Sequence, residues 1–241
     1  MALPTYVASG TYAEGTGAIV PGLPTGHTTN DILVLQVETN GTQPAAAPAG
    51  WTEFPSSPQD EAVAGGICLA AFWKRHDGSE TDPTVADTGN HQSAFVAAYR
   101  GVRTTGNPYD EGVSATNGSI DTSADTEFVS STITTTEPDC LVLCFAAHGL
   151  DGLTAANFGA PSNASLANLG DRHDDSTSAG SGGGIALFDG EKETAGAVDA
   201  FTSTMANSAV DANIVVALVG ESAGAAFIPL DDFGRMGIFG I

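Results

Sequence analysis

The chain has few basic residues and few cysteines, and it has no long apolar run. Its 241 residues include 7 Lys and Arg against 29 Asp and Glu, which gives a net charge of −22 at pH 7. A charge of this size repels phosphate backbones and anionic membrane surfaces. We therefore expect neither nucleic acid nor membrane as a partner, and we expect an acidic, well hydrated exterior.

No apolar stretch approaches the roughly eighteen residues that indicate a membrane-spanning helix. The first residues also lack a basic segment followed by an apolar one, the pattern of a signal peptide. The sequence thus predicts a protein that is made and kept in solution.

The three cysteines are too few and too poorly spaced to predict a disulfide framework. Cys140 and Cys144 lie in one apolar run, where four residues of extended chain separate their Cα atoms by roughly 13 Å, beyond the limit of about 7 Å for a disulfide. We interpret both, together with Cys68, as small buried apolar residues.

No segment shows a helical period with capping residues, so the predicted fold class is all-β. The apolar segments are short, rich in Val, Ile, Leu, Phe and Ala, and bounded by Gly, Pro, Asn, Asp or Thr. The predicted strands are Thr5–Thr11, Asp31–Thr39, Gly66–Lys74, Gln92–Arg100, Phe128–Thr135, Cys140–His148, Gly183–Phe188, Val198–Met205 and Asn213–Val219. Long polar loops are expected at 40–65, 77–91, 104–127 and 149–182.

The two halves of the chain resemble each other. "NDILVLQVETN" is similar to "PDCLVLCFAAH" at an offset of 108, "GGICLAAFWKRHDG" to "GGIALFDGEKE" at 118, and "QSAFVAAYRG" to "ANIVVALVG" at 119. Two copies of one strand unit, each burying a face against the other, predict a β-sandwich with jelly-roll-like connections.

Two aromatic side chains in the predicted loops could stack on sugar rings. Trp51 follows the stretch "PAAAPAG", and we expect it to fold back as a cap on the sandwich, with a sugar-stacking platform as the alternative. Tyr109 is the second possible platform, whereas Trp73 alternates within a predicted strand and is expected in the core.

"GESAG", residues 220–224, matches the G-x-S-x-G pattern of a serine hydrolase. That motif needs a helix after Ser222 and a histidine further along the chain. The last histidine is His173, and the residues after Gly224 include Pro229 and three glycines. We interpret the match as a coincidence and predict no catalytic residues.

The acidic clusters "GDRHDDS" and "RHDGSETD" match neither an EF-hand nor a zinc spacing. We therefore expect solvated acidic loops, no metal site and no cofactor, with a structural Ca²⁺ on one of these loops as the alternative. His27, His91 and His148 stand at the edges of predicted strands without an evident partner, and we expect them to be polar edge residues.

The most unusual segment is the C-terminal one. Full burial of its eight large apolar side chains contributes about 12–24 kcal/mol, while ordering fifteen residues costs on the order of 22 kcal/mol. Because these two free energies nearly cancel, we predict that 227–241 is a docking arm that becomes ordered only on a neighbouring subunit. It follows a sandwich domain at 1–219 and a hinge at 220–226. The arm residues are Phe227, Ile228, Leu230, Phe233, Met236, Ile238, Phe239 and Ile241. Alternatively, the segment wraps over its own sandwich.

Several ordered blocks, "MALPTYVASGTYAEGTGAIVPGLPTGHTTNDILVLQVET", "PAGWTEF", "AAFWKRHDGSETDPTVADTGNHQSAFVAAYRGV" and "NPYD", resemble a group of phage and prophage structural proteins. The similarity covers about residues 1–110 well and the second half loosely, and the segment from Phe227 departs from it. The resemblance implies a virion component with a β-sandwich or jelly-roll body. It implies no catalytic residues and does not fix the location on the particle.

From the resemblance and the arm together we expect a non-enzymatic protein that decorates the capsid as a cement or head-fibre protein. Such a protein is made in the host cytoplasm and ends on the virion surface. Its expected partners are other virion proteins, either major capsid or tail proteins, and copies of itself. The alternatives are a tail-associated or fibre protein, or a carbohydrate-binding adsorption module.

Overall fold

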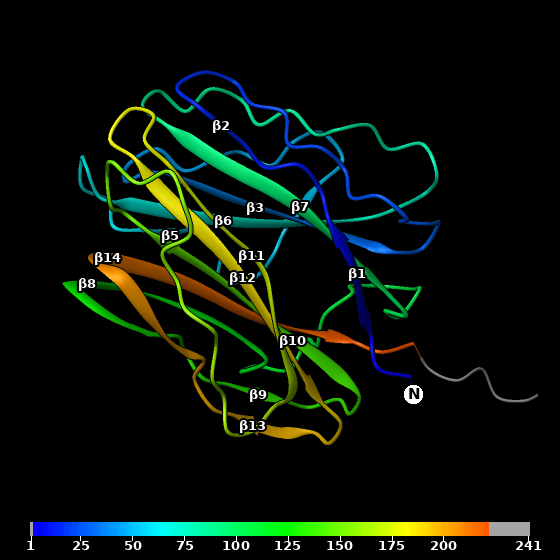
Figure 1. Cartoon of the computed structure of the whole chain (residues 1–241). Helices are drawn as coiled ribbons and strands as arrows, with labels where there is room; N and C mark the ends of the chain where they lie inside the picture. The colour runs from blue at the N-terminus through cyan, green and yellow to red at the C-terminus, as the bar shows by residue number, and fades with distance from the viewer. Residues whose placement is uncertain (1, 222–241) are drawn as a thin grey trace, which may run out of the picture.

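The computed structural model of the chain describes residues 2–221, which form strands, turns and irregular segments and contain no helix (Figure 1). In this part of the chain no helix is long and apolar enough to cross a membrane. The predicted all-β class is confirmed.

The strands are numbered in chain order. They are β1 (Thr5–Ser9), β2 (Ala13–Gly15), β3 (Ile32–Asn40), β4 (Thr52–Glu53), β5 (Gln59–Asp60), β6 (Ile67–Arg75), β7 (Gln92–Arg100), β8 (Thr116–Val129), β9 (Ile133–Thr135), β10 (Cys140–His148), β11 (Ala167–Thr177), β12 (Gly183–Lys192), β13 (Gly196–Val198) and β14 (Thr202–Val219).

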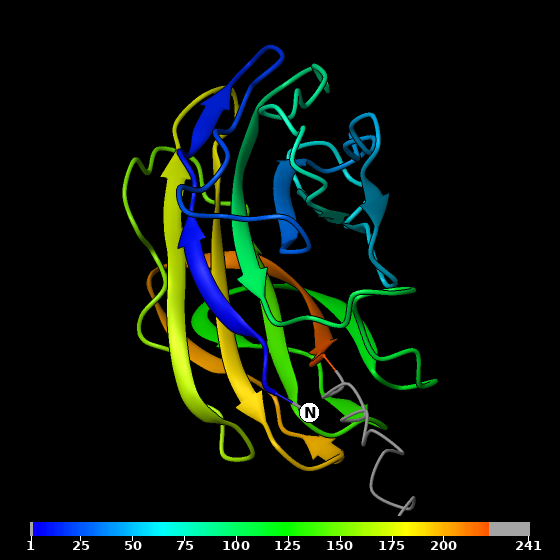
Figure 2. The ribbon, with the colours of Figure 1, turned by 90° about the vertical axis from the view of Figure 1, so that its right-hand side faces the viewer.

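Two antiparallel sheets form the body of the protein. The first has the order β1-β7-β3-β6-β4, with β2 also paired to β7 and β5 to β6. The second has the order β11-β12-β10-β14-β8, and β9 and β13 form a separate two-stranded ribbon. Figure 2 shows the two sheets as neighbouring layers.

Both sheets have the same topology. Without the short strands β2, β5, β9 and β13, five strands are left in each half of the chain. Read from β1 in the first sheet and from β8 in the second, these five lie in the order first, fifth, second, fourth, third, and β3 and β10 are the central strands. Ile32 of β3 pairs with Arg75 and Tyr99, and Cys140 of β10 pairs with Lys192 and Val219. The expected two similar halves are therefore present. Jelly-roll connections are not confirmed, because each sheet comes from one continuous half of the chain.

Each sheet is buried on both faces. The faces that meet form one apolar core, built on β3, β6 and β7 from one side and on β10, β12 and β14 from the other. Loops of the first half cover the outer face of the first sheet with Ile19, Ala45, Trp51 and Val85. Phe128, Phe158, Phe201 and Met205 are among the side chains that cover the outer face of the second sheet. All three cysteines are buried and free, as expected.

Double burial explains why the strongest strands are continuous apolar runs, because both faces of the strand need apolar side chains. It also hides which face turns inward. The sequence match places Leu33 opposite Leu141, but Leu33 packs on the outer face of its sheet and Leu141 in the core between the sheets. Matching the faces requires a slip of one residue, which pairs Ile32 with Leu141.

Three predicted loops contain strands, and the one at 40–65 contains the two-residue strands β4 and β5. β8 lies largely within 104–127 and β11 within 149–182, and both are edge strands whose polar sequences show no apolar alternation. The prediction of separate strands at Val198–Met205 and Asn213–Val219 was also wrong, because β14 runs unbroken from Thr202 to Val219. Pairing with buried neighbours, rather than their own side-chain pattern, makes these segments extended.

Candidate functional site

The predicted docking arm at 227–241 lies outside the described residues, as do Ser222 and the remainder of the predicted hinge. The structure does show where the two ends of the described chain lie. The backbone N–H of Ala2 donates to the carbonyl of Glu221 at 3.3 Å, so both ends of the described chain meet at one pole of the sandwich (Figures 1 and 2).

Arginines gather at this pole. Arg100 makes two hydrogen bonds to the carboxylate of Asp31, at 2.7 and 3.0 Å, and both residues line a hollow of about 280 Å³ together with Glu221. Arg75 lies within electrostatic range of Glu221 and Arg103. The described chain of this acidic protein therefore ends at the place where three of the six Lys and Arg in residues 2–221 lie together.

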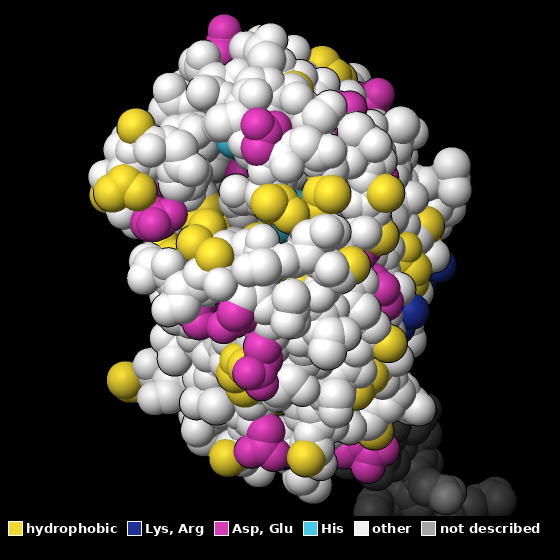
Figure 3. Space-filling view, turned by 60° about the vertical axis from the view of Figure 1, so that its left-hand side comes forward, with side chains coloured by type: hydrophobic (Ala, Val, Ile, Leu, Met, Phe, Trp, Pro, Cys, Tyr) yellow, Lys and Arg dark blue, Asp and Glu magenta, His cyan; other side chains and the backbone are white. Residues whose placement is uncertain are grey.

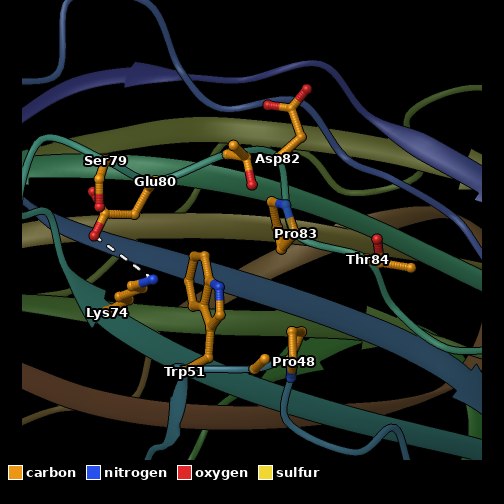
Figure 4. A pocket seen from close by; sticks show the side chains of 10 residues that line it. Pro48, Trp51, Lys74, Ser79, Glu80, Asp82, Pro83 and Thr84 are labelled. Carbon is orange, nitrogen blue, oxygen red and sulfur yellow. Dashed lines mark ion pairs between the residues drawn. The ribbon is translucent and has the colours of Figure 1, made fainter.

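Trp51 lines a hollow of about 380 Å³ over the outer face of the first sheet (Figure 4). One wall is the segment before Trp51, with Pro48 and Ala49, and the other is the segment from Ser79 to Thr84. The indole is 9% exposed and packs on the outer-face cluster that also contains Leu33 and Phe72. Most of the ring is thus a cap on the sheet, and its remaining edge faces the hollow.

Tyr109 lines a different hollow of about 300 Å³ with Pro55, Asp110, Glu111 and Thr116. Its ring lies 5.8 Å from that of Phe54, and burial followed by the nearby charge of Glu111 raises its pKa. The structure therefore places each of the two predicted platform residues at a surface hollow, but it does not bring them into one site.

Residues 36–40 of β3 place a row of polar side chains between the sheets. Gln36, Glu38 and Asn40 are separated by Val37 and Thr39, and all three are buried. The Glu38 carboxylate receives a hydrogen bond from Ser93 at 3.2 Å and lies 2.9 Å from Nε2 of His91. The expectation that His91 is a polar edge residue was wrong, because it is 1% exposed and paired with a buried carboxylate. His148 was misjudged in the same way, since it is fully buried and bonds to Ser176.

A serine completes this chain of groups. The hydroxyl of Ser181 lies 3.2 Å from Nδ1 of His91, which gives the order serine, histidine, glutamate that a nucleophilic centre uses. The same hydroxyl accepts a hydrogen bond from Asn40 at 2.8 Å and donates to Asn90 at 3.1 Å, and the Ser181 N–H also donates to Asn90. Ser181 therefore ties the loop between β11 and β12 to the first sheet.

The protonation of His91 decides what this chain of groups can do. Burial lowers the pKa of His91, but the hydrogen bond and the charge of Glu38 raise it by more, so the net shift is upward. An imidazolium carries protons on both nitrogens and cannot accept the proton of a serine hydroxyl. Burial raises the pKa of Glu38 as well, despite its hydrogen bonds, so the two groups form a buried hydrogen-bonded pair within the first sheet. Ser181 joins this pair to the β11–β12 loop of the second sheet.

The two acidic clusters do not converge on an ion. Within residues 2–221 no three His, Cys, Asp or Glu side chains are placed to hold a metal. In "GDRHDDS" the ring of His173 stacks on Phe95 at 3.9 Å, while Asp174 accepts the N–H groups of Asn157 and Phe158. In "RHDGSETD" Glu80 accepts the N–H of Asp77 and contacts His76. In both clusters a carboxylate holds a nearby loop in place by accepting backbone N–H groups.

The site and fold define an acidic two-sheet β-sandwich with solvent-open hollows and a link of buried polar groups. No family model, no curated protein and no solved structure matches the chain.

The sequence did carry a signal for the buried polar link. Polar residues at 36, 38 and 40 occupy alternate positions of a strand that is apolar from Ile32 to Leu35, and this spacing places them on one face. Their partners His91 and Ser181 come from distant loops without a recognisable spacing.

Proposed function

We propose that this protein is a non-enzymatic structural component of a phage virion surface, a capsid decoration protein that attaches through 227–241. Its partners are then other virion proteins and copies of itself. The proposal has two supports. One is the resemblance of residues 1–110 to phage and prophage structural proteins, and the other is the burial of most large apolar side chains within the body.

The observation that carries the proposal is that the body covers its own apolar surface. Loops cover both outer faces of the sandwich, and among the described residues the exposed large apolar side chains are Val20, Val63, Val113 and Val129, which do not form a core cluster. Acidic side chains are spread over the surface, with few basic ones between them (Figure 3). The segment 227–241, which lies outside the described residues, has eight large apolar side chains in fifteen residues, and in this proposal they attach the protein to a larger assembly.

The absence of catalysis is part of the proposal. Ser181, which contacts His91 and through it Glu38, has its hydroxyl and its N–H occupied by neighbouring amides. A raised histidine pKa further opposes base catalysis.

Removal of 227–241 tests the attachment. We expect the truncated protein to fold as a soluble body, with unchanged circular dichroism, and to be missing from purified virions when supplied in place of the full chain. Quantitative mass spectrometry of the particles measures its incorporation. Undiminished incorporation of the truncation would overturn the proposed role of the arm.

Two matched double variants test whether attachment depends on the arm or on apolar side chains elsewhere on the protein. Phe233→Asp with Phe239→Asp should abolish incorporation, because two charges cannot enter an apolar contact without a large cost. Val113→Asp with Val129→Asp adds the same charges to exposed positions of the body and should leave incorporation intact. Immunogold labelling of particles then distinguishes the capsid from a tail position, the alternative placement.

A further inference from the structure

The hollow beside Trp51 is a preformed feature of the first sheet. The strand pairing of Ile19 with Val85 anchors one end of its outer wall, with backbone hydrogen bonds of 3.0 and 3.1 Å. The carboxylate of Asp82 accepts the N–H of Leu23 at 2.8 Å. A wall held at several points can receive a ligand without first being ordered, which favours binding.

One side of the hollow is apolar and flat. Figure 4 shows the indole of Trp51 rising between Lys74 and Glu80 on one side and Pro48 and Pro83 on the other. The exposed edge of the indole beside the proline rings offers an apolar surface that the C–H groups of a sugar ring can contact. Because the rest of the indole is buried on the sheet, the surface is rigid.

Polar groups without partners surround this surface. Within residues 2–221, neither the indole Nε1 nor the hydroxyls of Thr81 and Thr84 make a hydrogen bond, although all three residues line the hollow. The ammonium of Lys74 lies 3.7 Å from the carboxylate of Glu80, which leaves donor capacity on the ammonium. The hollow thus combines an apolar wall with several unused donors and acceptors, the composition of a small-molecule site.

The charges narrow the ligand class. Glu80 and Asp82 outnumber Lys74 in the lining, and the whole protein is strongly acidic, so an anionic ligand is repelled. The many polar groups disfavour a lipid tail. We propose that this hollow binds one uncharged sugar ring, which packs against the exposed edge of Trp51 and the prolines and is held through its hydroxyls by Thr81, Thr84 and Lys74. This inference is independent of virion attachment, since it concerns the body alone.

Tryptophan fluorescence provides the test because the chain has two tryptophans. Trp73→Phe leaves Trp51 as the single reporter and removes an indole N–H that is buried without a partner. We expect neutral hexoses and N-acetylhexosamines to change the emission of this variant saturably, with a Kd on the order of 1 mM for at least one of them. If Trp73→Phe fails to fold, the two indole N–H resonances of the full chain, assigned with Trp51→Phe, report the same binding by NMR.

Matched threonine variants locate the site. Thr84→Val should weaken binding about 3- to 10-fold, because it removes a hydroxyl and keeps the shape. Thr116→Val makes the same change in the hollow beside Tyr109 and should leave affinity unchanged. The proposal is overturned by a flat titration up to about 100 mM across the panel, by equal effects of the two variants, or by tighter binding of glucuronate or sialic acid than of neutral sugars.

Discussion

At the scale of single residues, the structure buries several ionisable groups that the sequence places in ordinary strands. Asp211 of β14 is 2% exposed, and one of its carboxylate oxygens has no hydrogen-bond partner. Burial raises its pKa to about 7, with further contributions from the nearby charges of Asp121 and Asp125. The protonated form of Asp211 is therefore the one that the fold accommodates.

Asp211 makes stability depend on pH. In the unfolded chain the carboxyl group titrates near its usual pKa of 3.8, so between about pH 4 and pH 7 the folded state binds more protons than the unfolded one. Stability should fall as the pH rises through this window, by on the order of 2 to 4 kcal/mol from this residue. Asp211→Asn should be more stable at pH 8 and should flatten this part of the profile. Urea unfolding at pH 4.5 and pH 8 measures the difference, and an unchanged slope would refute the assignment.

At the scale of elements, the edge strand β8 shows how an acidic protein protects an exposed edge. Its residues 121–127 are all exposed, and β8 is the terminal strand of the second sheet. The carboxylates of Asp121 and Asp125 accept the N–H groups of Ser123 and Glu127, each at 2.8 Å. These contacts occupy backbone donors and add negative charge, and both effects oppose pairing with another chain.

Asp121→Ala with Asp125→Ala should promote self-association, because two backbone donors are freed and two charges are lost. Light scattering at increasing protein concentration measures the change. Asp77→Ala with Asp87→Ala serves as the control, since these aspartates accept N–H groups of Ser79 and Gly89 in the same way but lie in loops. If both double variants associate equally, net charge rather than edge protection is responsible.

At the scale of the whole molecule, the two halves share one core. Residues of both sheets form the cluster between them, so neither half can bury its inner face alone. We expect the body to unfold in one cooperative transition, as a single domain does.

The cysteines report on each half separately. Cys68 lies in the first sheet, Cys140 and Cys144 lie in the second, and burial raises the pKa of each thiol. All three should be unreactive in the native protein and should become reactive over the same range of urea concentration, followed by pulse alkylation and mass spectrometry. Exposure of Cys68 well before the other two would show that the halves unfold independently.

The sequence by itself determined the fold class, the central strands and the similarity of the two halves, because buried strands such as β3 and β10 need apolar side chains wherever they are placed. It also placed Trp51 and Tyr109 outside the regular strands of the interior. These features depend on composition and local pattern, which a single sequence displays.

Only the tertiary structure decided which face of each strand turns inward, where β8 and β11 pair, and that Glu38 meets His91 and Ser181. A strand buried on both faces has no alternation to reveal its orientation, and a polar edge strand is extended only because its neighbour holds it. The polar link joins groups from distant parts of the chain. Glu38 meets His91 because β3 pairs with β7, and Ser181 reaches them because one sheet packs on the other.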